Sequence, residues 1–147
     1  MESLAEKLTE IYLKKETWHT SKLSKEDADL YHRTLLMMGQ IFTYVSDNEL
    51  IGYLEVWRIN REQLSRLVLN EKVYALGEDI STGEIAYINN MWISPDERGG
   101  HVFNTLSNLF LEKHKDANFF IAFRSTKHNK PMQVYKRDEL IRLYKEK

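Results

Sequence analysis

The 147-residue sequence contains no cysteine, only two prolines and only six glycines. Without cysteine the chain forms no disulfide and offers neither a thiolate metal ligand nor a cysteine nucleophile, so we expect a reducing, cytoplasmic location. So few prolines and glycines leave little room for a long linker. The sequence also has no signal-peptide pattern at its start and no apolar run long enough to span a bilayer, and we expect no membrane partner.

An excess of charge of one sign is also missing, because 21 basic residues balance 22 acidic ones for a net charge of −1. This balance argues against a nucleic-acid partner. Basic residues do gather near the end of the chain, but acidic residues interrupt them, and a solvated surface explains them better. Apolar residues are abundant, at 42%. This composition predicts one ordinary domain, residues 1–147, with a substantial core.

The periodicity of the apolar residues predicts an α/β fold with a mixed sheet. Predicted helices cover residues 3–15, 24–38, a short segment from 60, 102–110 and 130–144. Predicted strands cover residues 40–45, 50–59, 84–94 and 119–123. Asp47-Asn48 supplies turn chemistry for a β-hairpin. Because a strand, a helix and another strand follow each other from 84 to 123, we expect a parallel pair there, and the hairpin makes the sheet mixed.

The segment that carries candidate chemistry is Arg98-Gly99-Gly100, between a predicted strand and a predicted helix. First-turn amides of a helix have no intrahelical acceptor, and the helix dipole adds partial positive charge there. Arg98 adds a donor fork suited to phosphate, and the two glycines let a ligand approach the backbone closely. The segment therefore predicts an anion site, although a plain strand-to-helix turn explains the glycines equally well.

The longer pattern is Ile88-x-x-Met91-x-Ile93-x-Pro95-x-x-Arg98-Gly99-x-x-Val102, followed by Leu106. It resembles the central motif of the GNAT superfamily of N-acetyltransferases. The resemblance implies a GNAT-like acyl-CoA N-acyltransferase fold, with a central mixed sheet flanked by helices and a shortened C-terminus. It also implies transfer of an acetyl group from acetyl-CoA to a primary amine of a small molecule or a protein.

The resemblance also implies roles for single residues. The arm of acetyl-CoA would lie along one strand segment, and the pyrophosphate would lie at the loop and the helix start. These residues are Met91, Trp92 and Ile93 for the arm, and Arg98, Gly99, Gly100, His101 and Val102 for the pyrophosphate, with Asn129 as a further cofactor contact. His101 and Phe103 stand where the family has small residues, so they put the cofactor role in question.

Acid and base candidates are fewer. By resemblance, Tyr135 in the last predicted helix would protonate the departing thiolate; the alternative is a helix tyrosine whose hydroxyl lies at the surface. Glu55 is the first candidate for the general base and Glu84 the second, and both are also explained as strand carboxylates that face solvent. No two histidines have the spacing of a helical metal pair, so we expect no metal site.

Two classes of function remain open from the sequence. The first is an N-acyltransferase, and the second is a GNAT-shaped binding or structural protein without catalysis. Reduced acetyltransferase-like proteins occur in viral and mobile-element genomes, and such an origin fits the second interpretation. The short segment after Tyr135 leaves room for at most one more short strand, and an unpaired sheet edge there would favour a homodimer.

Overall fold

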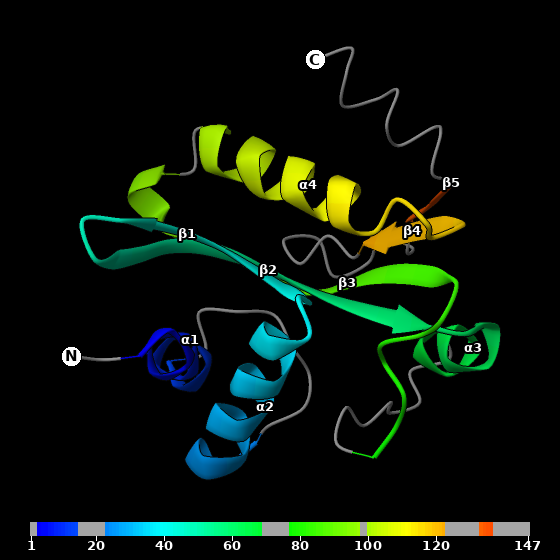
Figure 1. Cartoon of the computed structure of the whole chain (residues 1–147), viewed down its shortest axis with the longest axis horizontal. Helices are drawn as coiled ribbons and strands as arrows, with labels where there is room; N and C mark the ends of the chain where they lie inside the picture. The colour runs from blue at the N-terminus through cyan, green and yellow to red at the C-terminus, as the bar shows by residue number, and fades with distance from the viewer. Residues whose placement is uncertain (1–2, 15–22, 69–76, 98–99, 123–132, 137–147) are drawn as a thin grey trace. The chain divides into compact units, whose positions relative to one another are not determined.

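The computed structural model of the chain describes residues 3–14, 23–68, 77–97, 100–122 and 133–136 (Figure 1). Its elements are α1 (Leu4–Leu13), α2 (Lys25–Met37), β1 (Ile41–Ser46), β2 (Glu49–Ile59), α3 (Arg61–Val68), β3 (Ile85–Ile93), a 3₁₀ turn (Pro95–Glu97), α4 (His101–Lys113), β4 (Phe119–Ala122) and β5 (Gln133–Lys136). The strands follow the order β1-β2-β3-β4-β5 in the sheet. The predicted mixed α/β fold is confirmed.

Polar side chains fix where three of the helices begin. Ser3 and Ser24 are the N-caps of α1 and α2, and each hydroxyl accepts from the amide three residues later. At α3 the side chains of Asn60 and Gln63 accept reciprocally from each other's backbone amides, at 2.8 and 2.9 Å. Such a box satisfies two amides that the helix itself cannot, so the local sequence sets the start of each helix.

The β1–β2 hairpin follows from its turn. Asp47 and Asn48 have φ angles of 51° and 63°. Positive φ at both central residues is the geometry of the tight turn whose twist matches two antiparallel strands, and Asp and Asn tolerate it better than most residues. The two strands pair antiparallel, with Tyr44 opposite Gly52 in the register.

The chain is organised as two compact units, and the first comprises Met1–Glu55 and Asn90–Phe110. In this unit α1 packs on α2, and the two helices lie on the opposite side of the β1–β2 hairpin from α4 (Figure 1). Its core includes Leu8 and Leu35, both almost fully buried. The candidate anion loop belongs to this unit.

The second unit comprises Val56–Asn89 and Leu111–Lys147. In it β3 pairs parallel with β4, and β4 pairs antiparallel with β5. The Arg58 side chain joins the end of β2 to the segment before β4: its Nε donates to the Gly83 carbonyl oxygen at 2.8 Å, and its Nη1 lies 3.0 Å from Asp116 Oδ1. That 1–147 forms a single domain stays a prediction.

One predicted element is wrong. Residues 130–144 were expected to be helical, but Gln133–Lys136 forms strand β5, with Tyr135 opposite Phe120 of β4. The four residues are too few for their pattern to separate a strand from a helix, and pairing with β4 decides their conformation. Among the described residues, no helix is both long enough and apolar enough to cross a membrane.

Candidate functional site

The junction between β3 and α4 has the backbone geometry of a loop that opens a helix. After β3 ends at Ile93 and the 3₁₀ turn passes, Gly100 has a φ angle of +103°. Its carbonyl oxygen accepts from the Asn104 amide at 2.9 Å, so α4 begins immediately after this glycine. A glycine at the cap position brings no side chain to cover the amides that follow. Arg98 and Gly99 lie outside the described residues.

Gly52 of β2 holds the junction close to the hairpin. A Cβ built on Gly52 would lie 3.0 Å from Val102 Cγ1 and 3.1 Å from the Trp92 carbonyl oxygen. The Ser94 amide, just past β3, donates to the Ile51 carbonyl oxygen at 2.7 Å. The end of β3 and the first turn of α4 therefore both rest against β2, which fixes where the amides of α4 lie.

His101 is the first residue of α4, and its imidazole does not stand alone in solvent. The Tyr44 hydroxyl oxygen of β1 lies 3.2 Å from His101 Nε2. The two rings meet edge to face, with 5.8 Å between their centroids. This contact fixes the position of the bulky residue that the sequence raised as an obstacle in the loop. No pattern in the sequence links residues 44 and 101.

The three strand residues assigned to the acyl-CoA arm differ in exposure. Met91 and Ile93 are half-buried, whereas Trp92 is buried and its ring stacks on Tyr53. The Tyr53 hydroxyl in turn accepts from Asn90 Nδ2 at 2.9 Å. Trp92 therefore supports the strand from inside the core, and the half-buried pair Met91 and Ile93 are the side chains of this segment closer to the surface. The role of the segment in binding an arm stays a prediction.

Glu55, the first candidate base, is buried, with only 1% of its surface exposed. Its Oε2 accepts from the Tyr31 hydroxyl of α2 at 2.6 Å. Burial is the main cause that raises the pKa of the neighbouring Tyr12 phenol, and the charge of Glu55 adds to it. The alternative that Glu55 faces solvent is wrong. A carboxylate buried to this degree does not meet bulk solvent directly, and Tyr31 is one group through which a proton could reach it.

Glu84, the second candidate base, lies in the second unit and is half-buried. It accepts from Asn118 Nδ2 at 3.0 Å and from Arg61 Nε at 2.9 Å. The Asn118 hydrogen bond, followed by Arg61, lowers the pKa of this carboxyl. Both contacts favour the ionised form, which makes Glu84 a weaker base at neutral pH.

Sequence reasoning missed a buried histidine between α1 and α2. His32 is 1% exposed, and its Nδ1 lies 2.9 Å from Thr9 Oγ1. The Thr9 hydroxyl donates its one proton to the Ala5 carbonyl oxygen, so His32 Nδ1–H donates to Thr9 and its Nε2 carries no proton. Burial lowers the pKa of His32 to about 4. In the sequence its position on the apolar side of a helix is the only signal.

Tyr135 is on β5 rather than on a helix. The proposed role of its hydroxyl as an acid stays a prediction, and Asn129 lies outside the described residues. Nowhere in the described part of the chain do three acidic, histidine or cysteine side chains come together in a way that could hold a metal ion.

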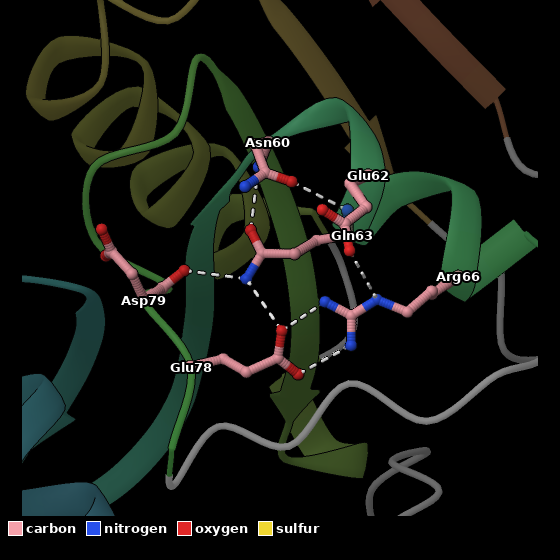
Figure 2. A network of polar contacts seen from close by, with 6 residues as sticks. All are labelled: Asn60, Glu62, Gln63, Arg66, Glu78 and Asp79. Carbon is pink, nitrogen blue, oxygen red and sulfur yellow. Dashed lines mark hydrogen bonds and ion pairs between the residues drawn. The ribbon is translucent and has the colours of Figure 1, made fainter.

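A second polar region lies in the second unit around α3. Figure 2 shows Gln63 of α3 between its partners: its amide nitrogen donates to the Asp79 carbonyl oxygen at 2.9 Å, and Arg66 pairs with Glu78. The same residues line an open hollow of about 430 Å³. Because Gln63 and Arg66 bond to Asp79 and Glu78, the network holds this part of the loop on α3.

Comparisons with known proteins show which solved structures have a similar fold. No family model matches the sequence, and no curated protein matches it. Five chains among the solved structures match. The loading GNATL domain of CurA from Lyngbya majuscula matches with a TM-score of 0.51 and 15% identity, over 88% of this chain and 68% of that one. The chain has a GNAT-like fold.

A second match is the ribosomal-protein-alanine N-acetyltransferase from Brucella melitensis, with a TM-score of 0.47 and 12% identity. It covers 81% of this chain, which spans 65% of that protein's length. At 15% identity, the match to the CurA domain concerns the fold of this chain and not its chemistry, because one fold carries many activities. Activity has to be argued from the residues of the site.

Proposed function

We propose that the chain is an N-acyltransferase that moves an acetyl group from acetyl-CoA to a primary amine of a small molecule or a protein. The observation that carries the proposal is the junction in the first unit: the end of β3, Gly100 at positive φ, and α4 starting directly after it. The amides of a first helical turn point along the axis toward whatever lies before the helix, and the dipole favours an anion there. A pyrophosphate is such an anion.

The strand before the junction supplies the second support. Met91 and Ile93 are half-buried at the end of β3, while Trp92 anchors the strand in the core. An extended arm such as pantetheine pairs with a strand through backbone amides and carbonyls. In the transfer step the amine nitrogen attacks the thioester carbon, the thiolate of CoA departs, and the amine loses one proton. A strand amide near Met91 or Trp92 would stabilise the oxyanion.

A second function, binding without catalysis, is favoured by one specific observation. Both candidate bases are already engaged: Glu55 is buried and bonded to Tyr31, and Glu84 is bonded to Asn118 and Arg61. A general base must reach the proton that it removes, directly or through one water. The chain would then hold an acyl-CoA without transferring its acyl group.

Titration calorimetry with acetyl-CoA tests the part that both functions share. We expect the wild-type chain to bind, and Arg98→Gln to bind at least about tenfold more weakly, because a charged hydrogen bond to phosphate is lost. Arg33→Gln is the matched control, since it also removes one guanidinium, from an exposed pair with Asp29 on α2. No heat from the wild type at millimolar acetyl-CoA, or equal losses in the two variants, would overturn the proposal.

Release of free CoA thiol then separates transfer from binding. The measurement uses acetyl-CoA with a panel of small amines and of peptides with free amino termini. Amine-dependent thiol release that Glu55→Gln abolishes supports transfer with Glu55 as the base. Tight binding with no release above the amine-free rate supports the binding protein instead.

A further inference from the structure

Tyr44, which contacts His101, has no role in the proposed function as described so far. Tyr44 lies on β1, directly opposite Gly52 in the strand register. Residues opposite each other in an antiparallel pair share one face of the sheet, and Gly52 lies against Val102 of α4 on that face. Because Gly52 has no side chain, the residue paired with Tyr44 puts no side chain between Tyr44 and the start of α4. The Tyr44 hydroxyl oxygen thus comes to 3.2 Å from His101 Nε2.

The chemistry of a neutral imidazole limits what this contact can be. A neutral imidazole carries one proton, on one of its two ring nitrogens, and the other nitrogen accepts. The proton is on Nε2, which then donates to Tyr44, or on Nδ1, with Tyr44 donating to Nε2. Only the second arrangement leaves an N–H on the ring atom nearer the backbone of the first turn. That N–H is a donor beside the amides of α4.

We propose that Tyr44 is a positioning residue that fixes His101 as an Nδ1–H donor for the pyrophosphate of acyl-CoA. The inference rests on the proposed function of the junction. The sequence placed His101 in the pyrophosphate loop; the inference adds that its imidazole supplies the contact there, where a small residue would leave bare backbone. Tyr44 holds the ring through the edge-to-face contact as well as the hydrogen bond.

Two substitutions of His101 discriminate between its ring nitrogens. The amide nitrogen of asparagine overlaps Nδ1, whereas that of glutamine overlaps Nε2. We expect His101→Asn to bind acetyl-CoA within about threefold of the wild type, and His101→Gln and His101→Ala to bind about tenfold or more weakly, as for a lost hydrogen bond to a charged group. His101→Gln binding as well as His101→Asn would overturn the inference.

The role of Tyr44 is tested through a double-mutant cycle. Tyr44→Phe should weaken binding in the wild type and change nothing in His101→Asn, whose donor needs no fixed ring. Thr43→Val is the matched control, because it removes a hydroxyl from the adjacent β1 residue, whose side chain points to the other face. With acetyl-pantetheine, which lacks the pyrophosphate, all variants should bind alike. A Tyr44→Phe effect that persists in His101→Asn would count against the proposal.

Nitrogen NMR of the free protein separates this inference from the proposed function. The ¹⁵N shifts of His101 report which ring nitrogen is protonated without any ligand. We expect protonated Nδ1 in the wild type and a mixture of the two tautomers in Tyr44→Phe. Protonated Nε2 in the wild type would refute the inference even if acetyl-CoA binds. The expected tautomer together with no acetyl-CoA binding would refute the proposed function, and the donor role of His101 with it.

Discussion

The stability of the chain should fall between pH 7 and pH 4.5 because of His32. Its pKa is lowered from 6.5 to about 4, by burial above all. Between these two values the unfolded chain binds a proton that the folded chain does not, so the free energy of unfolding rises with pH in this window and is lost as the pH falls. The difference of the two pKa values corresponds to about 3 kcal/mol, of which about 2 kcal/mol is lost from pH 7 to pH 4.5.

The structure explains why protonation of the His32 ring is unfavourable in the folded chain. With Nδ1–H bonded to Thr9, a second proton would sit on Nε2, which is buried and has no hydrogen-bond partner in the described residues. The rings of Tyr12 and Tyr31 lie edge-on to the imidazole, at 6.0 and 5.6 Å between centroids. Asp29 raises the pKa, but less than burial lowers it.

The assay is denaturant unfolding at several pH values between 7.5 and 4, followed by tryptophan fluorescence. His32→Asn keeps a donor toward Thr9 but cannot titrate, so between pH 7 and pH 4.5 it should lose about 2 kcal/mol less than the wild type, whatever its stability at pH 7. Thr43→Val should retain the wild-type dependence. Parallel curves for the wild type and His32→Asn would refute the reasoning. His114, whose pKa is also lowered to about 4 by burial, with a further contribution from Arg58, should make its own separate contribution.

Two further substitutions test close contacts in the fold. Gly83→Ala should destabilise the chain by about 2 kcal/mol or more, measured by denaturant unfolding, because a Cβ there would overlap the backbone of Ile59. Tyr31→Phe should cost about 2 kcal/mol in the same assay, since it removes the hydroxyl that donates to the buried Glu55 carboxylate; a loss below about 0.5 kcal/mol would show that this hydrogen bond does not stabilise the fold.

Much of the fold could be predicted because its signals are local. The Asp47-Asn48 turn, the Ser24 cap and the alternating residues of β3 each act within a few positions, and the structure confirms them. Strand β5 was missed for the opposite reason. Its conformation depends on pairing with β4, more than ten residues earlier in the chain. Four residues are also too few to show a periodicity that predicts a strand.

The site was less predictable, because its contacts join distant residues. The glycine before α4 could be found from the Gly-Gly pair, but the partner of His101 lies 57 residues away and that of Glu55 lies 24 away. A sequence shows the chemical type of such side chains and not which of them meet. For this reason the sequence overestimated the exposure of Glu55, and it placed His101 in the pyrophosphate loop without its contact with Tyr44.

If the proposed transfer uses Glu55 as its base, it depends on what Glu55 can reach. Glu55 is buried, and its Oε2 accepts a hydrogen bond from the Tyr31 hydroxyl. If Tyr31 passes a proton inward, the amine gives its proton to the phenol oxygen while the phenol proton moves to Glu55. Tyr31→Phe would then abolish transfer without affecting acetyl-CoA binding. If the pair only stabilises the core, the variant would lower stability and leave any transfer rate of the remaining folded protein unchanged.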